Sequence, residues 1–371
     1  MSETKQVILS AYDIKGAHFR NRLSVAPMTR VTATEDGLVT QTMRDYYLRF
    51  AKGGFGLVIT EGLYTDKAFS QGYLNQPGLA DEEQAAEWSM LNQDLQAQGT
   101  LVFAQIMHAG ALSQGNIYRH HNIAPSAVQP VGKQMTVYHG TGSYRMPVEM
   151  TEAEIAEAIQ GFVDTAARAV EVAGFDGIEI HGANGYLLDQ FLTAHTNLRN
   201  DCWGGDIRQR MSLLVEVVAA VKERVGAKVP VGIRISQGKV NDFKNKWLGG
   251  ESDAQIIFST LADAEVDFIH VTEYEAWQPA FEGSQESLVA MARKYAPGVS
   301  IIANGGLHDP DRAAEVIRSG ADLVALGRGA LGNPDYPLLI EAGAELREFD
   351  GSILQPIANI KERELDVELC E

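Results

Sequence analysis

The chain alternates short apolar runs with longer segments in which apolar residues recur at helical spacing. The apolar runs have the length and β-branched content of buried strands, and there are eight: Leu23 to Ala26, Leu57 to Thr60, Leu101 to Ile106, Ile178 to Ile180, Val231 to Ile235, Phe268 to Thr272, Ser300 to Ala303 and Leu323 to Leu326. Helical segments follow them in turn: Thr42 to Ala51, Asp81 to Gln98, Glu152 to Val172, Arg208 to Val225, Asp253 to Asp263, Gln285 to Tyr295, Pro310 to Ser319 and Asp335 to Leu346. Such alternation predicts parallel strands joined by right-handed crossovers. Eight units favour a single α/β domain over residues 1–371, a closed (β/α)8 TIM barrel, over an open sheet.

One connection is too long to be a simple loop. Residues 108–150 lie between the third predicted strand and Thr151, which forms a capping box with Glu154 and therefore begins a helix. Long structured excursions in a compact domain are typically lids or binding elements. We expect this one to be a lid over the mouth formed by the carboxyl ends of the strands. The segment before Leu23 is expected to plug the opposite end, and no role is assigned beyond Arg347.

Composition narrows the class of protein. The 371 residues carry a formal net charge of −18, which argues against nucleic acid, because binding a phosphate backbone requires clustered Lys and Arg. No apolar run approaches the length of a membrane span, and Met1 to Ser10 lacks the apolar core of a signal peptide. A cytoplasmic enzyme without a membrane partner is the expectation. Two cysteines are too few for a disulfide framework or a four-thiolate cluster, so any redox chemistry is expected to use an organic cofactor.

The main candidate for chemistry is the stretch from Phe175 to Phe191. Its apolar run leads into a glycine-punctuated loop that carries His181, Asn184 and Tyr186, after which a helical pattern begins. Three hydrogen-bonding side chains at the end of a strand can hold a polar substrate atom and supply a proton. The alternative is a loop whose His and Asn satisfy local backbone groups while the Tyr packs.

A second constellation follows the last two predicted strands. They end in Asn304-Gly305-Gly306 and Gly327-Arg328-Gly329. Glycines allow backbone N–H groups to approach an anion closely, and the loops after strands 7 and 8 of such barrels frequently hold a phosphate. The pattern therefore predicts phosphate binding, against the alternative of ordinary turn glycines and a surface Arg. The His120-His121 pair lacks further ligands at a metal-binding spacing, so no metal site is predicted.

Taken together, these motifs resemble the old yellow enzymes, flavin mononucleotide (FMN)-dependent oxidoreductases built on a (β/α)8 barrel. The resemblance runs from Asn21 to about Pro337. It rests on the order of motifs along the chain: Ala26 to Arg30, Thr60-Glu61-Gly62, Gln105 with His108-Ala109-Gly110, His181 to Phe191, Asn197-Leu198-Arg199, Gly232 to Ser236 and the two glycine loops. Departures occur at Ala111, Trp203 and Gln209, and the tail has no clear counterpart of an aromatic residue that some members contribute to the pocket.

The resemblance implies a role for each matched residue. Pro27, Met28 and Thr29 would lie against the flavin ring, Gly62 and Gln105 at one edge of it, and Arg234 at the opposite edge. The cofactor-binding set is completed by residues that would hold the phosphate: Gly306, Gly327 and Arg328. His181 and Asn184 would hydrogen-bond the substrate's carbonyl or nitro oxygen, and Tyr186 would donate the proton.

The implied function is that of an ene-reductase. NADPH or NADH would reduce FMN, and the small-molecule substrate, an α,β-unsaturated carbonyl or nitro compound, would then receive a hydride and a proton from Tyr186. Three alternatives stay open at this point: an FMN barrel that oxidises an amine or a ring substrate, a flavin-free lyase or isomerase that uses only the phosphate loops, and a non-catalytic flavin-binding protein. The physiological substrate, the preferred nicotinamide and the formation of a homo-oligomer are left open.

Overall fold

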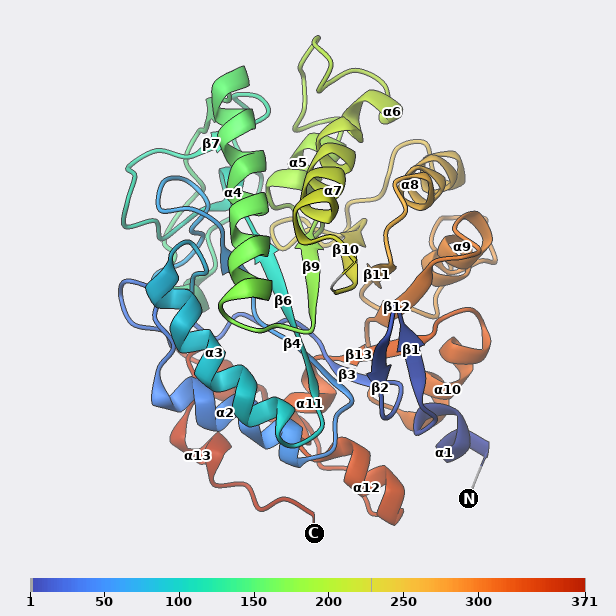
Figure 1. Ribbon diagram of the computed structural model, residues 1–371. Coiled ribbons are helices and arrows are strands. Elements are labelled where there is room, and N and C mark those ends of the chain that lie inside the picture. Colours follow the sequence, from blue (N-terminus) through green and yellow to red (C-terminus); the bar gives the residue numbers. More distant parts are fainter. Residues whose placement is uncertain (1–2, 228, 371) are drawn as a thin grey trace.

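The computed structural model describes residues 3–227 and 229–370, and within them eight parallel strands close into a barrel surrounded by helices (Figure 1). The barrel strands are β3 (Leu23–Val25), β4 (Leu57–Ile59), β6 (Leu101–Met107), β9 (Gly177–His181), β10 (Val231–Ser236), β11 (Phe268–Thr272), β12 (Ser300–Asn304) and β13 (Leu323–Leu326). They pair in chain order, and the pairing of β13 with β3 closes the ring. The predicted (β/α)8 barrel is confirmed, with each strand end within one residue of its predicted place.

The helices follow the strands as predicted, and their boundaries differ most from the prediction at three places. They are α2 (Gln41–Lys52), α3 (Glu82–Gln96), α4 (Glu152–Glu171), α6 (Ile207–Arg210), α7 (Ser212–Val225), α8 (Glu251–Asp263), α9 (Leu288–Tyr295), α10 (Pro310–Arg318) and α12 (Tyr336–Ala342). The predicted helix from Arg208 is divided at Met211 into α6 and α7. Helix α9 begins three residues late because the side chain of Ser287 caps it, and α12 ends early because Gly343 adopts a left-handed conformation.

Short elements complete the fold. The helix predicted after Tyr186 is α5 (Leu187–Leu192), and the elements that the periodicity did not predict include α1 (Glu3–Ile8), β5 (Leu63–Tyr64), α11 (Arg328–Gly332), α13 (Glu362–Leu365) and the 3-10 helix η3 (Gly351–Leu354). Each of these helices has six residues or fewer, too short for two turns of amphipathic pattern to stand out in the sequence. None of the helices among the described residues is long and apolar enough to cross a membrane.

The amino-terminal segment closes one end of the barrel. It forms a hairpin of β1 (Tyr12–Ile14) and β2 (Ala17–Phe19) (Figure 1). Its buried side chains Ile14 and Phe19 join an apolar cluster with residues from inside the barrel, among them Leu57, Phe103 and Phe268. Phe19 and Phe103 pack edge to face with ring centroids 5.8 Å apart. The predicted plug is confirmed, and the opposite, carboxyl end of the strands is left for a site.

Two arginines hold parts of the carboxyl-terminal segment against the barrel: Arg49 in α2, which donates to the carbonyls of Leu365 and Val367, and the buried Arg30. The guanidinium of Arg30 donates to both carboxylate oxygens of Glu364 in α13, over 2.8 and 2.6 Å, and to the carbonyl of Ala358 over 2.9 Å. Ile357 packs against the apolar cluster that contains Tyr186. The tail beyond Arg347, to which the sequence assigned no role, therefore reaches the side of the barrel where the catalytic candidates lie.

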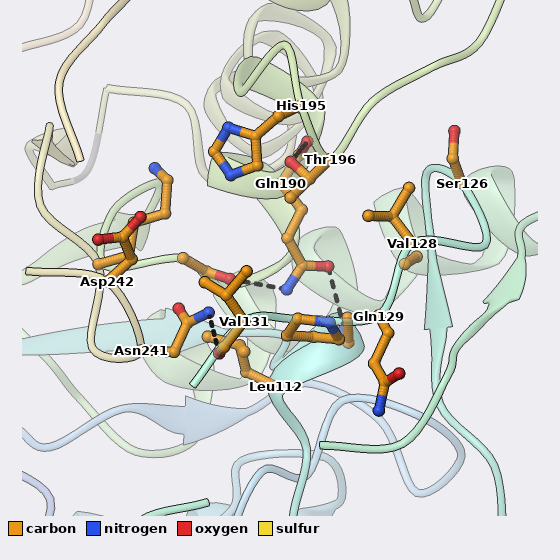
Figure 2. Close-up of a pocket in the computed structure, with 15 residues that line it drawn as sticks. Leu112, Ser126, Val128, Gln129, Val131, Gln190, His195, Thr196, Asn241 and Asp242 are labelled. Carbon is orange, nitrogen blue, oxygen red and sulfur yellow. Dashed lines mark hydrogen bonds between the residues drawn. The ribbon is translucent and has the colours of Figure 1, made fainter. Parts of the chain in front are cut away.

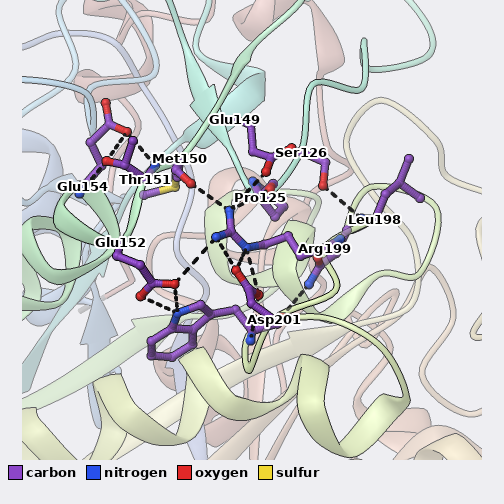
Figure 3. A network of polar contacts seen from close by, with 12 residues as sticks. Pro125, Ser126, Glu149, Met150, Thr151, Glu152, Glu154, Leu198, Arg199 and Asp201 are labelled. Carbon is purple, nitrogen blue, oxygen red and sulfur yellow. Dashed lines mark hydrogen bonds and ion pairs between the residues drawn. The ribbon is translucent and has the colours of Figure 1, made fainter.

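The excursion of residues 108–150 contains only short elements: η1 (Gly110–Leu112), β7 (Ile123–Ala124), η2 (Thr136–Tyr138) and β8 (Val148–Glu149). Arg199 holds it against the loop after α5 (Figure 3). Its guanidinium donates to the carbonyls of Met150 (2.7 Å) and Pro125 (3.2 Å) and pairs with Asp201. One side chain therefore joins the middle of the excursion and its carboxyl-terminal end to the loop after α5.

Candidate functional site

The loop after β9 turns sharply, and the backbone conformation of the turn determines the positions of its side chains. Asn184 (φ 62°) and Gly185 (φ 88°) both adopt left-handed conformations, so the chain reverses within two residues and Tyr186 becomes the residue that precedes α5. The N–H of Asn184 donates to Ser236 Oγ over 2.8 Å, and its carbonyl accepts from Val240 N over 3.0 Å. The loop is therefore attached to the end of β10.

His181 is a neutral histidine at the end of β9. It is buried, and burial, assisted by the cation of Arg234, holds its pKa well below the ordinary histidine range. Its Nδ1 accepts a hydrogen bond from Ala183 N over 3.3 Å, which leaves the proton on Nε2. The rings of His181 and Tyr186 pack edge to face with centroids 4.9 Å apart. The side chain is thus a hydrogen-bond donor next to the Tyr186 phenol.

Tyr186 is buried among other tyrosines. Burial raises its pKa well above the ordinary value for tyrosine, so its hydroxyl is protonated at neutral pH. The hydroxyl lies 2.5 Å from that of Tyr73, and Tyr138 and Tyr144 from the excursion belong to the same cluster. Sequence reasoning missed Tyr73. The only available signal was its glycine-rich loop after the second strand, and the 113 residues that separate it from Tyr186 hid the contact.

A charged layer lies inside the barrel beneath this loop. Glu179 accepts hydrogen bonds from Gln105 Nε2 and His270 Nδ1, each over 2.7 Å. Although burial opposes ionisation, His270 and Arg234 lower the pKa of Glu179 below its ordinary value, while burial lowers that of His270. An anionic carboxylate therefore accepts from a neutral imidazole. Glu179 and His270 were also missed, because each lies within a run that reads as apolar strand.

Arg234 connects this layer to the next strands. Its Nη2 donates to Asn304 Oδ1 over 2.8 Å and to Thr272 Oγ1 over 3.3 Å. Within the described part of the chain, Arg234 Nε and His270 Nε2 are buried atoms that have no hydrogen-bond partner. Because buried polar atoms are normally satisfied, a donor and an acceptor inside the barrel are left for a bound molecule.

The remaining predicted cofactor residues lie at the rim of the mouth. Pro27, Met28 and Thr29 follow β3 and are partly exposed. The pairing of β13 with β3 brings Gly327 beside Met28, where an added Cβ would lie 3.7 Å from its sulfur atom. Gly62 follows β4, where an added Cβ would lie only 2.0 Å from Met107 Sδ. A side chain at Gly62 is therefore excluded by packing.

The two glycine loops of the predicted phosphate site lie on neighbouring strands, because β12 pairs with β13. Gly306 has a left-handed φ of 65° and is exposed, as is Arg328, the first residue of α11. The structure thus brings the predicted residues to one mouth in two groups, the catalytic loop after β9 and the rim of β12, β13 and β3. No group of three His, Cys, Asp or Glu side chains that could hold a metal occurs in the described residues.

Glu61, next to Gly62, is a buried carboxyl whose ionisation is disfavoured. It accepts from Arg30 N over 3.0 Å, and burial raises its pKa to about 7. Because this is above the value of about 4.3 in an unfolded chain, the folded state binds the proton more tightly. The contribution of Glu61 to stability is therefore present at acid pH and is lost as the pH rises towards 7.

Glu61→Gln should remove this pH dependence. We expect the variant to melt a few degrees above the wild type at pH 8, with a difference that shrinks as the pH falls from about 7 to about 4, because glutamine stays neutral throughout. Melting curves across this pH range measure the difference. Glu157→Gln, at an exposed position of α4, is the control. A difference independent of pH would show that Glu61 does not titrate in this range.

Comparison with known proteins adds four findings. Residues 9–347 match the model of the NADH:flavin oxidoreductase / NADH oxidase family. An NADH oxidase of Thermoanaerobacter brockii is 35% identical over 334 residues, which cover 88% of this chain and 49% of that protein, so the chain spans about half its length. A probable flavin mononucleotide-dependent alkene reductase of Leishmania infantum is 33% identical over 359 residues, 94% of each chain. The solved old yellow enzyme homologue of Zymomonas mobilis superposes with a TM-score of 0.87 at 28% identity, over 98% of this chain and 99% of that one.

Proposed function

Because the chain belongs to the NADH:flavin oxidoreductase / NADH oxidase family, the old yellow enzymes, we propose that it reduces the activated C=C bond of α,β-unsaturated carbonyl or nitro compounds. It is an NAD(P)H-dependent flavin oxidoreductase with FMN as its cofactor. The observation that carries the proposal is the protonated, buried Tyr186 hydroxyl next to the neutral His181 at the mouth of the barrel. This pair offers a proton and a hydrogen-bond donor to one small molecule.

The residues at the mouth fit FMN. The unpaired Arg234 Nε and His270 Nε2 offer a donor and an acceptor inside the barrel, which suits a ring whose edge carries both kinds of group. We assign Pro27, Met28, Thr29, Gly62, Gln105 and Arg234 to the ring, and Gly306, Gly327 and Arg328 to the phosphate. When bound, FMN supplies the hydride that the β-carbon of the substrate accepts.

His181 and Asn184 would hold the substrate's oxygen. The neutral imidazole donates from Nε2, and the amide of Asn184 has two N–H donors. Two donors on one carbonyl or nitro oxygen stabilise the negative charge that develops there as the alkene accepts a hydride. Since His181 carries no positive charge, its contribution comes from the direction of its N–H bond, which the contact of Nδ1 with Ala183 N orients.

Tyr186 would deliver the proton to the α-carbon. Its high pKa keeps the proton in place until the substrate carbon becomes basic. The phenolate left behind would accept a hydrogen bond from Tyr73, 2.5 Å away. Tyr138 and Tyr144 place the 108–150 excursion against the same cluster, which supports the assignment of the excursion as a lid that excludes water from the proton transfer.

The visible spectrum of the purified protein tests this proposal. A flavin spectrum should bleach on anaerobic addition of NADPH or NADH and return on addition of cyclohexenone in the same cuvette. One equivalent of the saturated ketone should form for each equivalent of reduced flavin that is reoxidised. A flavin that bleaches only with an amine, without a nicotinamide, would favour a dehydrogenase or demethylase instead. A flavin that no enone reoxidises would contradict alkene reduction.

A further inference from the structure

A buried ion pair adjoins the catalytic loop but contains none of the residues assigned above. Lys239, which follows β10, lies 2.8 Å from both carboxylate oxygens of Asp189 in the first turn of α5. The side chains are 4% and 0% exposed. A buried ion pair adds little net stability compared with apolar residues of similar size, because both charges lose their hydration. Its contacts with the loop therefore decide what it does.

The pair holds the loop from both sides. Gly185 N, between Asn184 and Tyr186, donates to Asp189 Oδ2 over 2.6 Å. Lys239 forms a backbone bridge with Asn184, and the next residue, Val240, donates to the carbonyl of Asn184 over 3.0 Å. The loop is thus held by Asp189 of α5 on one side and by the backbone of Lys239 and Val240 after β10 on the other. The ion pair joins these two attachments, and the turn between them contains the left-handed residues Asn184 and Gly185.

A small pocket of about 50 Å³ borders the loop, and its walls include Gly185, Gln190 and Lys239. Figure 2 shows Leu112 and Val131 from the excursion around this pocket, with His195 and Asn241 facing it from the other elements. Gln190 contributes one further anchor, from its Nε2 to the carbonyl of Gly185 over 2.7 Å. Since Gly185 has no side chain, its hydrogen bonds with Asp189 and Gln190 restrain the loop at this point.

We propose that Asp189 and Lys239 form a clamp that positions Asn184 and Tyr186 for proton delivery. In this clamp the Asp189 carboxylate accepts the hydrogen bond from Gly185 N, and Lys239 orients that carboxylate. This inference rests on the proposed alkene reduction. Misplacing a reacting group by about 1 Å can cost about 10²-fold in rate, so loosening the clamp should slow proton transfer more than it slows reduction of the flavin.

Two double variants of the FMN-loaded protein, in which both side chains are uncharged, distinguish an effect on the position of the loop from an effect on the stability of the fold. Asp189→Leu/Lys239→Met removes both charges and the acceptor of Gly185 N, whereas Asp189→Asn/Lys239→Met removes the charges but keeps an acceptor oxygen. The Asn/Met variant should melt near the wild type, because replacing a whole buried pair is close to neutral. The Leu/Met variant should melt somewhat lower, because the buried Gly185 N loses its acceptor. Arg224→Met is the control, since it breaks an exposed ion pair with Glu171 on the outer helices.

We expect Asp189→Leu/Lys239→Met to be reoxidised by cyclohexenone at least tenfold more slowly, with reduction by NADPH changed less than threefold. Hydrogen exchange of the Gly185 and Tyr186 amides, which requires no turnover, should accelerate at least tenfold. In Asp189→Asn/Lys239→Met, the rate of reoxidation and the rates of amide exchange should both return most of the way to the wild-type values. Wild-type reoxidation and exchange in the Leu/Met variant would overturn the clamp, as would equal slowing of both half-reactions in step with a lower melting temperature.

Asp189→Ala/Lys239→Met decides the matter if the Leu/Met variant does not fold, because it leaves no unpaired buried charge and places no larger side chain at position 189. It also removes the acceptor of Gly185 N, so reoxidation should fall at least fivefold more than reduction by NADPH, and equal losses would overturn the proposal. If the reduced wild-type enzyme is not reoxidised by any enone, the proposed function is wrong. Comparing hydrogen exchange of the loop in the wild type and the variants then still shows whether the ion pair restrains the loop.

Discussion

Tyr186→Phe is expected to slow reoxidation of the reduced enzyme by cyclohexenone about 10²–10⁴-fold, the usual contribution of a positioned acid. The phenol is buried, protonated and 2.5 Å from Tyr73, and phenylalanine keeps the ring and its contact with His181 while removing the proton. Reduction of the flavin by NADPH needs no proton from this side chain, so its rate should change little.

Stopped-flow absorbance, with each half-reaction followed separately under anaerobic conditions, measures this difference. Tyr138→Phe is a matched control, because it removes another hydroxyl from the same cluster without removing the proposed acid. Equal slowing of the two half-reactions in Tyr186→Phe would show that the residue shapes the site and does not donate the proton.

Arg234→Met is expected to lower the rate of flavin reduction by NADPH about 10²–10³-fold, the loss typical of removing a fixed group that stabilises developing charge. The guanidinium is buried and held by Asn304 and Thr272, so its position is set before any ligand binds. Its loss also leaves the Glu179 carboxylate with one charged neighbour fewer. We therefore expect weaker retention of FMN as well.

The FMN content of the purified variant and the rate of bleaching by NADPH measure these two effects. Arg234→Lys keeps a cation but loses the planar fork that reaches both neighbours, so it should recover part of the rate. If Arg234→Met retains FMN and is reduced at the wild-type rate, the assignment of this residue to the flavin edge is wrong.

Several site residues could be predicted because their positions follow from chain order alone. His181, Asn184 and Tyr186 are close in sequence and follow a recognisable strand. Glu179 and His270 could not be predicted in this way. They are separated by 91 residues and meet inside the barrel only because their strands, β9 and β11, both pair with β10. A polar residue inside an apolar run gives no signal of which partner it will meet.

By itself, the sequence determined the barrel, the order of its strands and the edge at which the candidate residues gather. This was possible because strands buried on both faces read as continuous apolar runs, and because parallel strands all end at the same edge. Only the tertiary structure decided which groups touch: Tyr73 with Tyr186, Glu179 with His270, and Asp189 with Lys239. These contacts join residues far apart in the chain, so they depend on register and packing, which local periodicity does not encode.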